Sequence, residues 1–175
     1  MGEPVRLIVD LPNDADVVDL MIHRPGERLI VASSDGDGFI VPADEVVAQT
    51  RAGKQVMNLG DGAVMAACVP VAGDHVAVAS KNRKLLVFPL AELPEMTRGK
   101  GVRLQKYNMT RGRQGVLELD GGLSDLTTFT LAEGLSWPMP NGNTRTETGI
   151  AEWVAKRAGV GRAPPHGFPR DNRFR

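Results

Sequence analysis

An internal repeat is the feature that most constrains this 175-residue chain. The segment at residues 26–33 recurs 47 residues later at residues 73–80, as Gly-Glu-Arg-Leu-Ile-Val-Ala-Ser and then Gly-Asp-His-Val-Ala-Val-Ala-Ser. Each copy continues into a polar turn, a second apolar run and then a Thr-Arg pair followed by Gly-Lys. A period of about 47 residues, with four short strands per unit, is typical of propeller blades. Because one such unit buries only one face by itself, neighbouring blades must pack to complete the core.

Short apolar runs separated by turn residues support the same class. They are rich in Val and Ile, and we expect strands at residues 5–9, 17–22, 28–32, 38–41, 64–71, 75–79 and 85–88. Many short strands with frequent turns indicate an all-β sandwich, barrel or propeller. The repeat favours the propeller among these three, with a short helix and a tail at the C-terminal end.

The third copy of the repeat is irregular. Residues 61–71 align with residues 121–131 at an offset of 60, after an extra segment near 108–119. We expect no second hairpin strand after Trp137, a loop at residues 138–143, and a helix at 147–158 that Gly159 ends. The predicted organisation is one set of blades over residues 1–165, with repeats at 14–61, 62–107 and 120–165. A basic tail follows at residues 166–175.

The zero net charge hides a strong asymmetry. Residues 1–80 carry 5 Lys/Arg and 12 Asp/Glu, a net of −7, whereas residues 81–175 carry 16 and 9, a net of +7. This asymmetry indicates a polyanion-binding surface, although solvated charges also produce it. No apolar stretch approaches the ~20 residues of a membrane span, and the N-terminus lacks a secretory signal pattern. The single cysteine, Cys68, is predicted to be a buried thiol in a reducing cytoplasm.

Basic turns that contain glycine are the candidate functional sites. Thr-Arg-Gly-Lys-Gly stands at residues 97–101, with a weaker copy at 50–54 and another at 157–162. Glycine lets the main chain approach a phosphate, while Arg and Lys neutralise the backbone charge of DNA. If the blades stack around an axis, equivalent turns form one basic rim. The predicted DNA-binding residues are Arg98, Gly99, Lys100, Gly101, Arg103, Lys106, Lys81, Arg83, Lys84, Arg51, Lys54, Arg111 and Arg113. An ordinary solvated surface is the alternative.

Other chemistries find no support in the sequence. No Gly-x-x-x-x-Gly-Lys-Ser/Thr motif is present, so a nucleotide phosphate loop is not expected. His23, His75 and His166 lack the spacing of metal ligands, and nothing matches a catalytic triad. We therefore assign no catalytic residue and no metal site. Trp137 and Trp153 are predicted to be core residues rather than base-stacking platforms.

Residues 95–107, Glu-Met-Thr-Arg-Gly-Lys-Gly-Val-Arg-Leu-Gln-Lys-Tyr, resemble the C-terminal domain of the bacterial DNA topoisomerase IV A subunit. The similarity continues through residues 121–125, 128–131, 134–137, 152–154 and 163–172. It implies a β-pinwheel, a propeller relative whose blades exchange strands, with DNA bent over a basic rim. The related gyrase A subunit carries a Gln-Arg-Arg-Gly-Gly-Lys-Gly box, of which residues 97–101 are a degenerate form. This departure favours topoisomerase IV over gyrase, and bending over full wrapping.

The resemblance further implies a parent ATP-dependent type II topoisomerase of the bacterial cytoplasm and nucleoid, acting in decatenation and supercoil relaxation. The cleaving tyrosine, Mg²⁺ and ATP belong to other parts of that enzyme, so we expect no cofactor and no cleavage activity in this chain. Expected partners are double-stranded DNA, the catalytic A-subunit core and the ATPase B subunit, without a membrane. Three alternatives stay open: a gyrase A C-terminal domain, a protein-interaction propeller without a DNA role, and DNA contacts made by the tail at residues 156–175.

Overall fold

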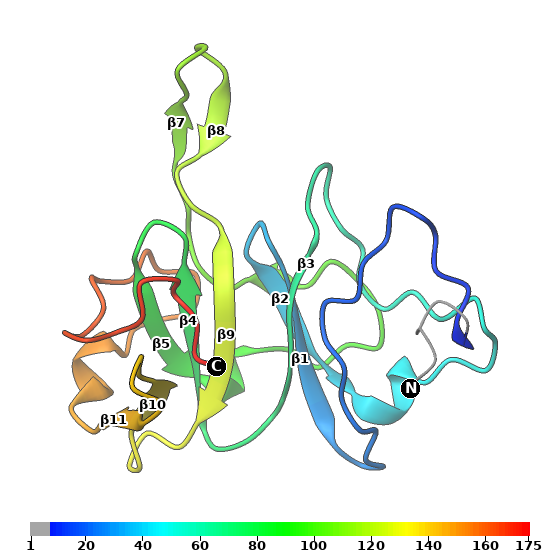
Figure 1. Cartoon of the computed structure of the whole chain (residues 1–175), viewed down its shortest axis with the longest axis horizontal. Coiled ribbons are helices and arrows are strands. Elements are labelled where there is room, and N and C mark those ends of the chain that lie inside the picture. The colour runs from blue at the N-terminus through cyan, green and yellow to red at the C-terminus, as the bar shows by residue number, and fades with distance from the viewer. Residues whose placement is uncertain (1–7) are drawn as a thin grey trace.

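The computed structural model describes residues 8–175, whose regular secondary structure is mainly short β-strands in two larger and two smaller sheets (Figure 1). The helices named within these residues are the single 3-10 turns η1 (Ala43–Val46), η2 (Leu90–Glu92) and η3 (Ile150–Trp153). Across residues 8–175, no helix combines the length and the apolar character that a membrane span requires. The prediction of an all-β chain is therefore confirmed.

The first blade is built around one antiparallel hairpin. β1 (Arg28–Ser33) pairs with β2 (Asp37–Pro42), and Gly36 takes the positive φ of 90° that the connecting turn needs. β3 (Met65–Pro70) adds to the free edge of β1, and β6 (Val102–Arg103) adds to β2. The sheet order is β3-β1-β2-β6, so its last strand comes from much further along the chain than the other three.

The second blade repeats this plan. β4 (His75–Ser80) and β5 (Leu85–Pro89) form the hairpin, and β9 (Leu123–Phe129) pairs with β4 as β3 pairs with β1. Leu85 forms an isolated antiparallel bridge with Arg162, at the place where β2 pairs with β6. Each hairpin is thus completed by a strand or bridge that the next unit supplies. This exchange is the β-pinwheel arrangement that the resemblance implied.

The structure corrects the alignment of the third repeat. Ala32 pairs with Ala67 and Ala79 pairs with Asp125, so β3 and β9 correspond at an offset of 58, not 60. Side chains alternate between the faces of a strand with a period of two, so a slip of two residues leaves the inward and outward pattern unchanged. Alternation of apolar residues therefore could not distinguish the two alignments.

A third sheet, predicted to lack its second strand, has one. β10 (Leu135–Pro138) pairs antiparallel with β11 (Thr144–Glu147). The predicted helix at 147–158 is also wrong beyond the single turn of η3. Val87 forms a bridge with Val154, and its carbonyl accepts the Ala155 N–H at 2.8 Å, so β5 holds this segment extended. Tertiary pairing overrides the helical spacing of Ile150, Trp153 and Val154.

Three apolar clusters form the core. The largest lies between the two main sheets and includes Ile30, Val78 and Leu126. A second lies between the second blade and the third sheet, where Trp137 is 1% exposed, as predicted for a core residue. The third covers the other face of the first hairpin, with Leu29, Val31 and Phe39 among its members. Both faces of β1 are therefore buried, which explains its continuous apolar run.

The segment before the first blade does not form the predicted strand. Residues 17–22 have no ladder partner, because β2 and β3 occupy both edges of β1. Residues 17–19, 21 and 22 line an apolar cavity of about 500 Å³ together with Leu29, Val31 and Cys68. Cys68 is half-buried rather than fully buried as predicted, and burial raises the pKa of its thiol to about 11. Of the expected strand at 5–9, residues 5–7 lie outside the described residues, and Ile8 and Val9 are not in a strand.

The extra segment predicted near 108–119 projects from the molecule as a hairpin (Figure 1). β7 (Met109–Arg111) pairs antiparallel with β8 (Leu117–Leu119), and we call residues 109–119 the arm. At its base, the Asn108 N–H donates to Asp120 Oδ1 at 2.9 Å, and the Asp120 N–H donates to the Asn108 carbonyl at 2.8 Å. The arm is therefore a closed ribbon attached at one point to the two blades.

Candidate nucleic-acid interface

The glycines of the turn at residues 97–101 serve packing between units. Gly101 has φ 86°, and a Cβ there would lie 2.5 Å from the Gly38 carbonyl oxygen of β2. Gly161 occupies the equivalent place in the second blade, with φ 84° and the Leu85 carbonyl oxygen 2.7 Å from the position of a Cβ. The Gly99 N–H donates to the Val56 carbonyl at 3.3 Å, so it is engaged within the protein. These glycines permit strand exchange, which the sequence alone did not indicate.

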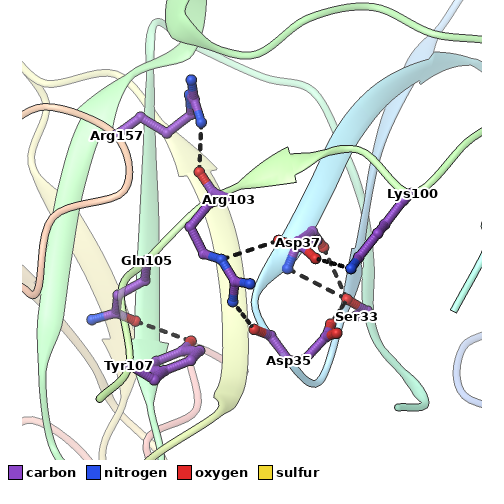
Figure 2. A network of polar contacts seen from close by, with 8 residues as sticks. All are labelled: Ser33, Asp35, Asp37, Lys100, Arg103, Gln105, Tyr107 and Arg157. Carbon is purple, nitrogen blue, oxygen red and sulfur yellow. Dashed lines mark hydrogen bonds and ion pairs between the residues drawn. The ribbon is translucent and has the colours of Figure 1, made fainter. Parts of the chain in front are cut away.

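Two of the predicted DNA contacts share one internal carboxylate. Asp37, whose side chain is 7% exposed, lies 3.5 Å from Lys100 Nζ and 3.2 Å from Arg103 Nε (Figure 2). Arg103 also donates to the Asp35 carbonyl, and Ser33 Oγ accepts the Asp37 N–H at 3.4 Å. The register explains this cluster, because Asp37 pairs with Arg103 across β2 and β6. Asp37 therefore offsets much of the positive charge that this turn would present to a phosphate.

Four further predicted contacts are also engaged by the protein. Arg98 donates to Gln55 Oε1 at 3.0 Å, which joins the turn at 97–101 to the segment that follows its weaker copy. Lys54 lies 3.4 Å from Glu45, and Arg51 donates to the Ile8 carbonyl at 3.2 Å. Arg83 donates to the Pro169 carbonyl at 2.6 Å and to Asn172 Oδ1 at 3.2 Å. The Arg83 contacts fix the C-terminal segment onto the turn between β4 and β5.

Five of the predicted contacts form no ion pair with any residue in the described part of the chain. They are Lys81, Lys84, Lys106, Arg111 and Arg113. The first three lie around the base of the arm, and we call them the lysine edge. The Lys81 N–H donates to the Gly122 carbonyl at 2.9 Å, just after the arm returns to the body. Lys106 precedes Tyr107, and Lys84 lies in the turn between β4 and β5.

Buried polar residues hold the lysine edge and the arm together. Gln105, fully buried, donates to the Lys84 carbonyl at 3.4 Å and to the Val160 carbonyl at 2.9 Å. Tyr107 donates to Gln105 Oε1 at 3.3 Å (Figure 2). Its ring packs against Gly36 and Gly121. Burial raises the pKa of the Tyr107 phenol far above its usual value, so the phenol stays protonated. This tyrosine is a structural anchor between the two blades.

The C-terminal tail reaches the same edge. A polar cavity of about 300 Å³ is lined by Ser34, Lys81, Ser124 and Arg173, among others. Arg173 has no ion pair within residues 8–175, whereas Arg175 is bound to Asp19 at 2.8 Å. The candidate rim and the alternative tail site therefore meet at one place. Arg173 is a candidate contact that reasoning on single residues missed, since only the overall basic character of the tail pointed to it.

Arg157, the first residue of the third basic turn at residues 157–162, is also engaged within the protein. Its guanidinium donates to the Arg103 carbonyl at 2.6 Å (Figure 2). The guanidinium also donates to the Glu92 carbonyl at 3.0 Å, and the Arg157 backbone N–H donates to Glu92 Oε2 at 2.6 Å. These hydrogen bonds hold β6 against the later segment at residues 157–162. The structure thus divides the basic residues into a paired group at the glycine turns and an unpaired group at the lysine edge and arm.

Comparisons with known proteins agree with this architecture. The profile of the family described as "DNA gyrase C-terminal domain, beta-propeller" matches residues 27–72 and 74–122, which begin beside β1 and β4. The A subunit of DNA topoisomerase 4 from Rickettsia conorii is 42% identical over 173 residues, and that from Caulobacter vibrioides is 41% identical over 175. Each alignment covers 99% of this chain, but the chain spans only 22% and 21% of those proteins.

Among solved structures, the Escherichia coli ParC C-terminal domain superposes with a TM-score of 0.76 at 24% identity. That alignment covers 97% of this chain and 68% of the solved one, which supports the fold. The family profile accounts for more than half of the chain, in the two blades that carry the lysine edge. The chain therefore belongs to the family of β-propeller-like C-terminal domains of the topoisomerase IV and gyrase A subunits.

Proposed function

We propose that this chain binds and bends duplex DNA as the C-terminal domain of a topoisomerase IV A subunit. In this role it presents DNA to a catalytic A-subunit core that works with an ATPase B subunit, for decatenation and supercoil relaxation in a bacterial cytoplasm. Cleavage, Mg²⁺ and ATP belong to those other parts. The burial of Tyr107, the only tyrosine in the chain, supports a non-cleaving role, because a nucleophile must reach its phosphate.

The observation that carries the proposal is the lysine edge. Lys81 and Lys84 share the turn between β4 and β5, to which Gly122 and Gln105 hydrogen-bond, and Lys106 follows Gln105 directly in the chain. No carboxylate among the described residues forms an ion pair with any of the three. An unpaired lysine gains more from a phosphate than a lysine already bound to a carboxylate, because it gives up no ion pair on binding. Arg173 extends this edge into the cavity beside Lys81.

Bending is supported by the position of the cations on two blades. Lys81 and Lys84 belong to the second blade, while Lys106 follows the strand β6 that completes the first. A duplex that contacts both groups crosses the junction between two sheets. Smoothly bending a short duplex costs on the order of 1–6 kcal/mol, and additional phosphate contacts offset this cost.

The test is a salt series of DNA binding with a matched pair of variants. We expect the chain to bind linear duplex and supercoiled DNA, with an affinity that falls steeply as salt rises, and to speed the ligation of a short duplex into circles. The double variant Lys81→Ala with Lys106→Ala should make the negative slope of log affinity against log salt shallower by about 2. Each lost phosphate contact accounts for about 0.9 of this slope. The same slope in this variant and the wild type would place the interface elsewhere.

The control removes two arginines from the other end of β1. Arg24→Ala with Arg28→Ala removes two positive charges, as the lysine variant does. Unlike the two lysines, Arg24 and Arg28 are already paired, with Glu27 and Glu95. The salt slope of this control should match that of the wild type. If the unaltered chain fails to bind at low salt, the proposed function itself is contradicted.

A further inference from the structure

We propose that the arm enters the major groove of duplex DNA that lies over the lysine edge. This inference rests on the proposed function and deepens it, since it assigns a groove contact to a chain otherwise expected to read only the phosphate backbone. It concerns residues 109–119 as one unit, including its apolar side chains.

The arm carries an apolar face that the other described residues leave substantially exposed. Its register places Met109 opposite Leu119 and Arg111 opposite Leu117 on one face of the ribbon. The three apolar side chains are 56%, 40% and 60% exposed for Met109, Leu119 and Leu117 respectively. An isolated two-stranded hairpin is only marginally stable in water, so a ribbon of this kind gains order when a partner covers it.

The charges of the arm select a polyanion as that partner. Arg111 shares the apolar face, and Arg113 stands in the turn at the tip; neither forms an ion pair with the described residues. The carboxylate of the arm, Glu118, lies on the opposite face, paired across the ribbon with Thr110. An apolar face without an acid, flanked by two free guanidinium groups, complements base edges and thymine methyls between two rows of phosphates.

The dimensions agree with the major groove. Two paired strands are about 4.8 Å apart, and the major groove of about 12 Å admits a two-stranded ribbon with its side chains. The minor groove, at about 6 Å, is too narrow unless base steps are unstacked. The three residues of β7 alone rise about 10 Å, which exceeds the groove depth of about 8.5 Å.

The arm is held in a fixed relation to the lysine edge. Two hydrogen bonds between Asn108 and Asp120 close its base, and the neighbouring Tyr107 is packed between Gly36 and Gly121. After the arm, the Leu123 N–H donates to the Ser34 carbonyl at 2.9 Å, and the Gly122 carbonyl accepts the Lys81 N–H. When a duplex contacts Lys81 and Lys106, the arm therefore lies next to one of the grooves of that duplex.

The test is methylation of a short duplex by dimethyl sulfate, which modifies guanine N7 in the major groove and adenine N3 in the minor groove. With the 175-residue chain bound, we expect partial protection of guanine N7. Protection should disappear when residues 109–119 are replaced by a two-residue Asn-Gly turn between Asn108 and Asp120, because that turn closes such a hairpin without the ribbon. Binding of this variant should be about tenfold weaker.

Two further variants keep the inference separate from folding defects. Arg111→Ala with Arg113→Ala should reduce the guanine N7 protection, whereas Arg24→Ala with Arg28→Ala should not. Protection of adenine N3 alone, or equal guanine protection with and without the arm, would overturn the inference while leaving DNA binding intact. If the variant that lacks the arm no longer binds the catalytic A-subunit core but gives an unchanged DNA footprint, the arm contacts protein and the inference is overturned. Failure of the unaltered chain to bind DNA at all would overturn both proposals.

Discussion

At the scale of single residues, pairing decides which cations are available to a ligand. Lys100 and Arg103 belong to the most conspicuous basic motif of the sequence, yet both contact the buried carboxylate of Asp37. Lys81 and Lys106 stand in less conspicuous positions and have no such partner among the described residues. Counting basic residues along the chain therefore overstates the positive charge at the glycine turn.

Asp37→Asn tests this distinction. The amide keeps the shape of the side chain but releases Lys100 and Arg103, so DNA affinity should rise by about threefold at low salt if these two residues lie in the footprint. Stability should fall by about 1 kcal/mol, because both cations are substantially exposed and their pairing is screened. Fluorescence anisotropy and urea unfolding measure the two effects.

Asp44→Asn is the control, because it makes the same charge change at an exposed aspartate paired with His23. If the two variants bind DNA with equal affinity, the glycine turn is not part of the interface.

At the scale of strands and turns, the exchange between units explains the repeated Gly-x-Gly pattern. Gly101 lets the chain approach β2, and Gly161 does the same at Leu85 of β5. Gly53, in the weaker copy of the motif, has φ 81°, but a Cβ at this position would meet no atom within 4 Å. Gln55 stands in the weaker copy where Gly101 stands in the stronger one, so the two copies differ at the position that packs closely against the neighbouring hairpin.

Gly101→Ala and Gly53→Ala form a matched pair that measures this constraint. Both substitutions place a side chain at positive φ, which costs about 1 kcal/mol. Only Gly101→Ala also forces β6 away from the Gly38 carbonyl, so its total loss of unfolding free energy should be about 3 kcal/mol. Thermal or urea unfolding gives both values. Similar losses would mean that β6 is held loosely and that exchange contributes little to stability.

The sequence predicts those elements that carry strong apolar runs. The strands β1, β2, β3, β4 and β5 fall at the expected places because their residues are buried on the blades. β11 was missed because Thr-Arg-Thr-Glu is polar and half exposed, and residues 17–22 were wrongly expected to be a strand because a run of Val, Leu and Ile does not reveal whether a sheet edge is free. The pairing of Asp37 with Lys100 and Arg103 joins residues more than sixty positions apart, which no local pattern indicates.

At the scale of the whole molecule, the C-terminal segment is part of the core. Trp137, Phe168 and Phe174 stack edge to face with ring centroids 5.3 and 5.4 Å apart, and both phenylalanines are buried. Arg83 and Asp125 hold the same segment through hydrogen bonds to Asn172 and to the Phe174 N–H. Residues 166–175 therefore close the second blade as well as carrying basic side chains.

Deleting residues 166–175 should consequently lower the unfolding free energy by about 3–5 kcal/mol, the usual cost of removing buried aromatic side chains. Arg170→Ala with Arg173→Ala should change it by less than about 0.5 kcal/mol, because both side chains are exposed. Urea unfolding of the two variants distinguishes these outcomes. If the deletion is as stable as the double substitution, the aromatic cluster is not a structural element of the domain. For DNA binding, the double substitution is the informative variant, since the deletion also disturbs the fold.

Strand exchange also sets an order of events during synthesis on the ribosome. The edge of β2 is fully paired only when residues 94–96 and 102–103 have emerged, and the edge of β5 only when residues 154–155 and Arg162 have done so. Each unit is therefore completed only after the next has been translated, and closure proceeds from the N-terminal blade to the C-terminal one. A nascent chain that stops between two units exposes an unpaired strand edge, which is the form most prone to pair with another chain.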